Sequence, residues 1–460
     1  MKSKIVIKSL VSAFALVAVT SCGIYSKYET PTDTILTKAY VEARESAAND
    51  STAFGNLRWE EVFTDPVLQD YITRALSNNI SLNDARLNVE LAQTQLKGAK
   101  LAFFPSVAIS PNGAGASYSG GKMNWTYQIP MSVSWEVDIF GKLLNNKRTA
   151  KVGVETAEFY AQAVRSQIIS GVANTYYAIA SVESQLALSR NTARLWAKSV
   201  QTMQDLYDAG RTNKAAVVQF EANYQSVLAS ITDLEVTRVK LNNTMSILLG
   251  TMPQEYHVAA DATLELPMLT VSGVPMQYLA NRPDVNVAER GLASAFYTTA
   301  GARAAFYPGL TITANGGFTN LLGSMVKNPG DWFVQLAGSL VAPLFSRGQN
   351  IARLEAAKIS QRQAMNKFES TLMSAAAEVS EDLTTYEKAA ERAGYLDKQI
   401  AALEKSVEYT NDLMVYSNGT YLEVLTAQQS LLQAQMNRLS CQLTRVQALI
   451  NLYQAMGGGR

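Results

Sequence analysis

The sequence predicts a mainly α-helical protein that also carries a transmembrane β-barrel, and three observations support this. Residues Met123 to Ile139 alternate strictly between apolar and polar side chains, as in a strand with two different faces. Two long stretches, 132–251 and 345–460, contain no proline and are rich in Ala, Gln, Leu and Glu, which is typical of long helices. The same order of elements then occurs twice, which indicates two internal structural repeats.

The strand at 123–139 carries Trp125 and Tyr127 toward one end of its apolar face and Trp135 toward the other. Ten residues rise about 33 Å along a strand, and a tilt of about 45° leaves about 23 Å along a membrane normal. That is close to the apolar band of about 25 Å in outer-membrane barrels. We therefore expect the three aromatic residues to form a lipid-facing girdle and the polar face to line a wet lumen. The alternative is a long strand in a soluble sandwich.

Residues 1–21 resemble a bacterial lipoprotein signal peptide. Three lysines precede an apolar run from Leu10 to Val19, and two small residues then lead to Cys22. We expect cleavage before Cys22 and lipidation of its thiol; the alternative is an ordinary signal peptide with an incidental cysteine. Removal of 1–21 takes away three lysines, so the mature charge is 37 − 39 = −2. Cys441 is then the one remaining thiol, and we expect a buried helical residue there.

Residues 22–64 look irregular, and we expect an extended tether. The first repeat follows at 65–250. Asp65 and Pro66 predict a helix start, and that helix runs to about Ala102 with a break near Asn78 and Asn79. A weakly alternating strand at 107–119, a Gly-Gly turn and the strand at 123–139 predict a β-hairpin.

Two long helices complete the first repeat, at 145–207 and 213–249, with Gly210 as a C-terminal cap between them. A heptad-like apolar seam near the end of the first predicts coiled-coil packing. Residues 251–280 form a loop-rich connector.

The second repeat, 281–456, begins at Arg282-Pro283-Asp284, which we interpret as a helix start. A strand at 310–315, a glycine-rich turn and a partner strand at 332–344 follow. A helix at 351–416 and a return helix at 422–456 close the repeat, and 457–460 is expected to be disordered. Each chain thus supplies four barrel-type strands, which cannot close alone. A dimer would supply eight strands and a trimer twelve.

The chemistry of an enzyme is missing from the sequence. His257 is the single histidine, and there is neither a CxxC pair nor a phosphate-binding glycine loop. The 40 basic and 39 acidic residues nearly balance, so no nucleic-acid surface is indicated. We expect no enzymatic activity, cofactor, metal or nucleic-acid partner.

Several segments carry a family resemblance, namely Trp59–Leu68, Ser134–Lys142, Arg282–Asp284 with Ala288-Glu289, and Val424–Gln428. In these segments the chain resembles the outer-membrane efflux protein family, the TolC-like ducts, and specifically the NodT-like lipoprotein branch of RND-type efflux systems. The resemblance covers essentially the whole mature chain. It implies a homotrimer with a twelve-stranded barrel in outer-membrane lipid and a periplasmic α-barrel of long antiparallel helices. An equatorial belt from 22–64 and 251–280, a periplasmic adaptor and an inner-membrane RND pump are also implied.

The two helix tips are the expected functional positions, because they lie about 100 Å from the lipid if the helices are straight. For adaptor docking we single out Gly210, Arg211, Thr212 and Asn213 at the first tip, and Asn418, Gly419, Thr420 and Tyr421 at the second. For gating of the aperture we single out Asp208, Tyr416 and Glu423. Three copies of Glu423 would form a negative ring, whereas Thr426 stands where relatives carry a second acid.

The function expected is a passive exit duct for small molecules in the outer membrane, extending into the periplasm. One alternative keeps the architecture but makes the chain a type I secretion duct for polypeptides. Another is a lipid-anchored coiled-coil scaffold without a pore, which would not need a strand with two different faces.

Overall fold

The computed structural model describes residues 24–47, 54–117, 120–258, 276–322, 325–343, 347–416 and 421–459. The chain divides into two compact units. The bounds of unit 1 are Met1–Thr37, Leu87–Phe159 and Asn286–Ser370, and those of unit 2 are Lys38–Arg86, Tyr160–Val285 and Thr371–Arg460. Each unit therefore draws on both halves of the chain. The expected signal peptide, Cys22 and residues 259–275 of the expected connector lie outside the described residues.

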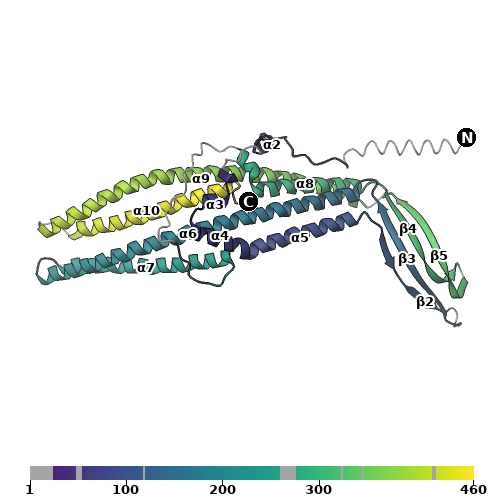
Figure 1. Ribbon diagram of the computed structural model, residues 1–460, viewed down its shortest axis with the longest axis horizontal. Coiled ribbons are helices and arrows are strands. Elements are labelled where there is room, and N and C mark those ends of the chain that lie inside the picture. The colour runs from purple at the N-terminus through teal and green to yellow at the C-terminus, as the bar shows by residue number, and fades with distance from the viewer. Residues whose placement is uncertain are drawn as a thin grey trace. The chain divides into compact units, whose positions relative to one another are not determined.

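The helices follow the predicted order. Their bounds are α2 (Ile35–Ala47), η2 (Phe54–Asn56), α3 (Trp59–Val62), α4 (Pro66–Asn78), α5 (Ile80–Leu101), α6 (Lys142–Asp208), α7 (Lys214–Leu249), η3 (Met276–Asn281), α8 (Pro283–Ala304), α9 (Gln349–Tyr416) and α10 (Tyr421–Ala455). The long helices α6 and α9 have 67 and 68 residues, and the return helices α7 and α10 have 36 and 35. Figure 1 shows each return helix beside its long partner. These matched lengths confirm the two helical repeats.

The helix ends have the local causes that the sequence indicated. Asp65 caps α4 by accepting hydrogen bonds from the amides of Val67 and Leu68, and Pro66 occupies the first helical position. Asn79 separates α4 from α5, which confirms the predicted break. Gly250 ends α7 at φ 67°, a left-handed conformation that favours glycine.

The strands of unit 1 form one antiparallel sheet. Their bounds are β1 (Ser106–Ile109), β2 (Asn112–Ala116), β3 (Asn124–Val137), β4 (Gly309–Leu322) and β5 (Met325–Val341). β1 and β2 both pair with the single long strand β3, β3 pairs with β4, and β4 pairs with β5. The two predicted hairpins are therefore joined edge to edge within the chain (Figure 1).

The glycine-rich turn expected after residue 315 was wrong, because β4 continues through Gly316 and Gly317 to Leu322. A Cβ on Gly317 would lie 2.2 Å from the carbonyl oxygen of Ile129 on β3. Glycine is needed here because two strands approach closely. Glycine is also typical of turns, which is why the sequence indicated a chain reversal at this point.

The segment 22–64 is only partly the irregular tether that we expected. Residues 26–33 have no regular structure, but α2, η2 and α3 occupy much of the described remainder. The sequence of α2 is rich in good helix formers, and the Thr34 hydroxyl accepts a hydrogen bond from the amide of Thr37 at its start. Local helix propensity thus outweighs the polar composition that indicated a tether.

The expectation of disorder at 457–460 was also wrong for Gly457–Gly459, which form a buried turn; Arg460 lies outside the described residues. The Ser166 hydroxyl donates to the carbonyl of Gly458 at 2.5 Å, and Arg165 donates to that of Gly459 at 2.7 Å. A Cβ on Gly458 would lie 2.4 Å from the ring of Tyr453. Three consecutive glycines serve close packing here rather than disorder.

Unit 2 holds the largest described core, where α3, α4, α6, α7 and α10 meet. Its fully buried side chains include Phe63, Leu68, Ile72, Ile169, Tyr176 and Tyr453. Among the described helices, none is long and apolar enough to cross a membrane.

Candidate functional site: the apolar strand face and the helix tips

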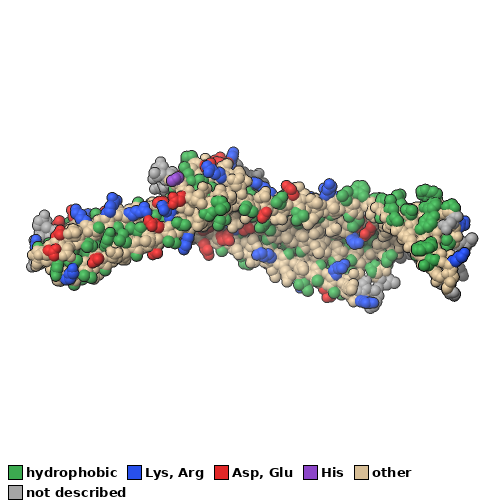
Figure 2. Space-filling view, turned by 90° about the horizontal axis from the view of Figure 1, so that it is seen from below, with side chains coloured by type: hydrophobic (Ala, Val, Ile, Leu, Met, Phe, Trp, Pro, Cys, Tyr) green, Lys and Arg blue, Asp and Glu red, His purple; other side chains and the backbone are tan. Residues whose placement is uncertain are grey.

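One face of the sheet in unit 1 is apolar along β1, β3, β4 and β5. The register places Val107 opposite Val133, Trp135 opposite Ile312, and Ile312 opposite Gly338. Directly opposed residues lie on the same face, so the odd positions of β3 and the even positions of β4 and β5 form one surface. Figure 2 shows hydrophobic side chains gathered over the strands.

Large hydrophobic side chains are usually buried in folded proteins, but on this face they are highly exposed. On β5, Trp332, Val334 and Leu336 are 81%, 89% and 76% exposed. A contiguous apolar patch of this kind marks a surface that meets lipid or another protein.

The expected girdle residues all lie on this face. Trp125 and Trp135 are exposed, Tyr127 is half-buried, and the indole of Trp135 donates to the carbonyl of Phe103 at 2.9 Å. Tyr127 stacks on Phe318, and Phe318 meets Trp332 edge to face, with centroids 6.1 and 6.4 Å apart. Sequence reasoning missed Phe318 and Trp332, although the alternation Trp332, Val334, Leu336 carries the same signal.

The opposite face of the sheet is polar. On β3 it carries Ser132, Ser134 and Glu136, which pair with Asn315, Thr313 and Thr311 of β4. The carboxylate of Glu136 accepts from Lys142 at 2.8 Å. The sheet therefore has one apolar and one polar face, as the alternation of residues 123–139 predicted.

The first tip is a tight helix-to-helix turn in unit 2. Gly210, at φ 67°, donates from its amide to the carbonyl of Tyr207, and the Arg211 amide donates to that of Leu206. This pair of bonds is a Schellman motif, which explains the need for glycine. Asn213 caps α7 by accepting from the amide of Ala216 at 3.0 Å. Its side chain thus has a structural task in addition to the expected docking role.

The residues expected to dock an adaptor at the first tip are accessible. Gly210, Arg211 and Asn213 are exposed, and Thr212 is half-buried. At the second tip Asn418, Gly419 and Thr420 lie outside the described residues, and Tyr421 is half-buried at the start of α10.

One apolar cluster brings the two tips together. Trp196 and Met203 of α6 and Phe220 of α7 form its buried centre with Leu425 of α10. Partly buried side chains that pack against it include Met414 and Tyr421. The side-chain amide of Gln429 also donates to the side chain of Asn223. The second helix pair is therefore seated on the first near its end.

The expected gating residues are not in mutual contact within the described part of the chain. Asp208 is exposed and accepts a hydrogen bond from Gln204 of its own helix at 2.8 Å. Glu423 is exposed in the first turn of α10, where the helix dipole favours an acid. The side chain of Tyr416 lies outside the described residues.

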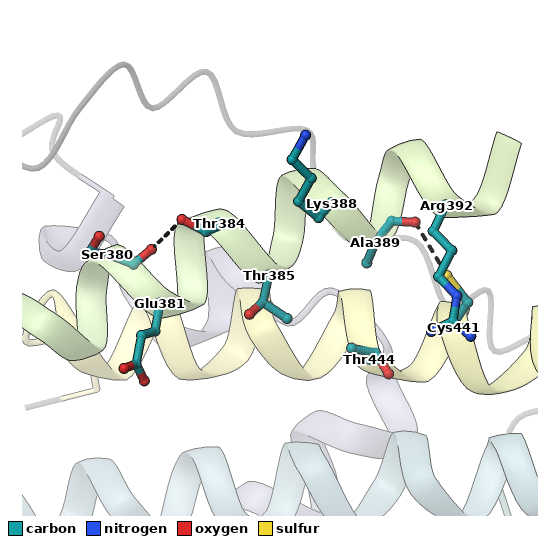
Figure 3. Close-up of a pocket in the computed structure, with 9 residues that line it drawn as sticks. All are labelled: Ser380, Glu381, Thr384, Thr385, Lys388, Ala389, Arg392, Cys441 and Thr444. Carbon is teal, nitrogen blue, oxygen red and sulfur yellow. Dashed lines mark hydrogen bonds between the residues drawn. The ribbon is translucent and has the colours of Figure 1, made fainter. Parts of the chain in front are cut away.

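A shallow groove of about 590 Å³ lies between α9 and α10. Figure 3 shows its lining, with hydroxyl groups from Ser380, Thr384 and Thr385 and the thiol of Cys441. Cys441 is 2% exposed and its Sγ donates to the carbonyl of Ala389 at 3.3 Å, which confirms the buried helical cysteine. In the described residues no group of His, Cys, Asp and Glu side chains converges to hold a metal ion.

Comparisons with known proteins agree with this geometry. The model of the family described as outer membrane efflux protein matches residues 71–251 and 274–458, which are the two repeats. The probable outer membrane lipoprotein SilC of Salmonella typhimurium is 28% identical over 413 residues, covering 87% of this chain and 88% of its own. The cation efflux system protein CusC of Escherichia coli K12 is 26% identical over 453 residues, covering 96% and 97%.

Solved structures of outer-membrane channels are also similar to this chain. A CusC crystal structure superposes with a TM-score of 0.81 at 25% identity, covering 88% of this chain and 95% of that one. The open state of the MtrE outer membrane channel of Neisseria gonorrhoeae gives 0.78 at 27% identity, covering 89% and 93%. The chain belongs to the outer membrane efflux protein family and is an outer-membrane exit duct of the kind that serves tripartite efflux pumps.

Proposed function

We propose that three copies of this chain close a twelve-stranded barrel and continue as a periplasmic tube of long helices. The observation that carries this proposal is the sheet with one apolar and one polar face. Its order β1-β3-β4-β5, with β2 also on β3, leaves β5 and the β1/β2 edge without a neighbour among the described strands. Exposed strand edges are not tolerated in lipid, so neighbouring copies are needed to pair them. Three copies of four strand positions make twelve.

Cys22 is the proposed lipid anchor, and the girdle of Trp125, Tyr127 and Trp135 is the proposed interface with lipid head groups. A single acyl anchor binds membranes only marginally, so a second membrane signal is needed. The exposed apolar sheet would supply that signal.

The helix tips are the proposed docking site for a periplasmic adaptor, which would couple the duct to an inner-membrane RND pump. Support comes from the exposed residues Gly210, Arg211 and Asn213 on a rigid Schellman turn. The carboxylate of Glu423, repeated three times, would form the narrow acidic ring of the aperture. Asn418, Gly419, Thr420 and Tyr421 would complete the docking surface, and Asp208 and Tyr416 would contribute to its closure.

The cargo is proposed to be small molecules, for which the duct is a passive conduit. CusC is named for cation efflux, and cations are therefore one class to test. A duct for secreted polypeptides has the same architecture, and a poreless scaffold has the same helices.

Two experiments separate these functions. The full-length protein is extracted from outer membranes, checked for a trimer band that shifts on heating, and reconstituted in planar bilayers. The proposal expects a heat-modifiable trimer with discrete conductance steps. A monomeric protein without conductance would instead support the scaffold. Deletion of the gene that encodes this chain should make the host more sensitive to drugs or cations and leave polypeptide secretion intact. The reverse result would support the secretion duct.

A further inference from the structure

Every junction between a helix and the sheet of unit 1 carries a basic residue. Lys100 and Arg303 each stand one residue before the end of their helix, α5 and α8. Lys142 is the first residue of α6, and Arg347 stands two residues before α9. Acids are almost missing from the four helix ends. Glu355 is the single acid in the segments 92–101, 140–151, 291–304 and 347–362. This end of the helices is therefore basic, although the charges of the whole chain nearly balance.

Two of these junctions share a short motif that joins the base to aromatic rings. Residues 100–105 read KLAFFP, and residues 303–308 read RAAFYP. In each case two aromatic residues follow the base within about one helical turn. Phe104 is 68% exposed and Phe306 is 42% exposed. Bases beside exposed aromatic rings, at the end of an apolar surface, are typical of a membrane–water interface, where the rings lie at the level of the head groups.

In the first repeat this motif contacts both the sheet and α6. The indole of Trp135, on the apolar face of β3, donates to the carbonyl of Phe103 at 2.9 Å. The Nζ atom of Lys147 lies 5.7 Å from the centre of the Phe103 ring, within the range of a cation–π contact. Lys147 of α6 therefore lies beside the end of the apolar face. We call the group Lys100, Phe103, Phe104, Trp135 and Lys147 the basic–aromatic shelf.

The two lysines of the shelf differ from their neighbours on α6 in their ion pairs. Lys142 pairs with Glu136 of the polar face at 2.8 Å, and Lys151 pairs with Glu155 at 3.7 Å. Neither Lys100 nor Lys147 forms an ion pair with any residue that the structure describes. Their positive charge is thus left for an external anion, whereas the base on the polar face is already neutralised.

The N-terminal segment lies at the same level and supplies independent support. The carbonyl of Ile24 accepts from the side-chain amide of Asn145 at 3.0 Å, and the hydroxyl of Tyr25 donates to the carbonyl of Ile139. Both partners lie at the junction of β3 and α6. The expected lipidation site, Cys22, is two residues from Ile24, which corresponds to at most about 7 Å of extended chain. A lipid anchor on Cys22 would therefore enter the membrane next to the shelf.

We propose that the basic–aromatic shelf binds the head group of an acidic phospholipid. Lys100 and Lys147 would bind the phosphate, and the acyl chains would lie on the apolar face beside Trp135. Bases near a membrane surface attract anionic lipids, so the shelf selects a negative head group over a zwitterionic one. Arg303 and Phe306 would form the equivalent site of the second repeat. This inference rests on the proposed barrel, because it needs the apolar face to meet lipid.

The lipid selectivity of the full-length protein tests the proposal. The protein is reconstituted in phosphatidylcholine vesicles that contain a trace of spin-labelled phosphatidylglycerol or spin-labelled phosphatidylcholine, and the immobilised fraction of each label gives their relative association. We expect phosphatidylglycerol to be favoured about threefold to fivefold in about 0.05 M NaCl, and less than about twofold in about 0.5 M NaCl. Sodium phosphate at the same ionic strength should act no more strongly than NaCl. A stronger effect of phosphate would assign a site for a free anion and overturn the lipid site.

Matched variants locate the preference. Lys100→Gln combined with Lys147→Gln should remove about half of it, because the second-repeat site remains, and further addition of Arg303→Gln should remove most of the rest. Lys398→Gln combined with Lys405→Gln is the control. It removes the same charge from exposed positions of α9 in unit 2 and should leave the preference unchanged. An unchanged preference in the Lys100 and Lys147 variant would contradict the shelf.

Conductance and the trimer band are measured on the same vesicles, so that failure of this site is distinct from failure of the barrel. A conducting trimer that associates equally with both lipids would overturn the head-group site and leave the barrel intact. A protein that forms neither a trimer nor a pore in these vesicles would overturn both.

Discussion

Tyr176, buried in α6, donates its hydroxyl proton to the carboxylate of Asp65 at 2.6 Å, although 111 residues separate them. The same carboxylate caps α4 through the amides of Val67 and Leu68. One acid therefore fixes the start of a helix and ties it to the core of unit 2. The sequence indicated the cap, but nothing in it pointed to the tyrosine.

Tyr176→Phe should lower the free energy of unfolding by roughly 1.5–3 kcal/mol, because a partly buried hydrogen bond to a charged group is lost while the ring is kept. Thermal unfolding of the purified protein measures the effect. Tyr160→Phe, at an exposed position of the same helix, is the control and should have almost no effect. Equal stability of both variants would show that the bond contributes nothing.

The elements that sequence reasoning predicted are those with strong local causes. The period-2 pattern of β3, the proline at the start of α8 and the glycine cap at Gly210 each act within a few residues. The errors have a common origin. Gly317 and Gly457 are glycines because backbone atoms of Ile129 and Asn281, far away in the sequence, approach them, and a single sequence carries no trace of such contacts.

The candidate site also contains features that the sequence predicted and features that it did not. The apolar face was predicted because alternation is local, whereas the bulge at Asn320, whose side chain donates to the Trp125 carbonyl at 2.9 Å, was not. Arg282 was interpreted only as part of a helix start, because its partners Glu378 and Ala455 are 96 and 173 residues away. Long-range polar contacts are invisible to periodicity and propensity.

Val334→Arg tests the two faces of the sheet. Val334 lies on the apolar face and is 89% exposed, so a charge there should cost about 2–4 kcal/mol if this face meets lipid. The expected result is a large loss of trimer from outer-membrane extracts, measured as the band that shifts on heating. Gln335→Arg places the same charge on the neighbouring polar position and should be tolerated. Equal yields of the two variants would contradict a lipid-facing surface.

Gly458→Ala tests whether the glycine turn at the end of α10 is a packed element. The added methyl group would meet the Tyr453 ring at 2.4 Å, and such overpacking costs about 1–3 kcal/mol. The apparent melting temperature should fall. Gly394→Ala is the control, because nothing lies within 4 Å of its Cβ position in α9, and that variant should be neutral or slightly stabilised. An unchanged melting temperature for Gly458→Ala would restore the view of a loose tail.

Asp382→Asn tests the charge balance of the acidic residues beside Arg282. Burial, together with the nearby carboxylates of Glu378 and Glu381, raises the pKa of Asp382 to about 6. An unfolded aspartate has a pKa of about 3.9, so between these values the folded protein binds more protons than the unfolded chain. Stability should therefore rise as the pH falls from about 7.5 to 5. Because the group is half exposed, we expect only about 1 kcal/mol.

Melting temperatures at the two pH values measure this gain, and Asp382→Asn should be stabilised at pH 7.5 and lose most of the pH dependence. Asp412→Asn, at an exposed position of the same helix, should keep it. A gain of equal size in the Asp382→Asn protein would assign the pH dependence to other groups.

Glu423→Ala combined with Arg211→Ala tests the proposed aperture. Both side chains are exposed, so neither packs in the core of unit 2. Their removal should therefore leave the melting temperature unchanged. If three copies of Glu423 form an acidic ring held by contacts between copies, the double variant should conduct more current per channel in planar bilayers and discriminate less between cations and anions.

Glu221→Ala, at an exposed position of α7, is the control for this experiment. It removes a charge elsewhere and should leave both the conductance and the ion selectivity unchanged. A shift in conductance with Glu221→Ala would show that conductance responds to the net charge of the tube and not to the Glu423 ring. An unaltered conductance and ion selectivity in the double variant would place the constriction at other residues.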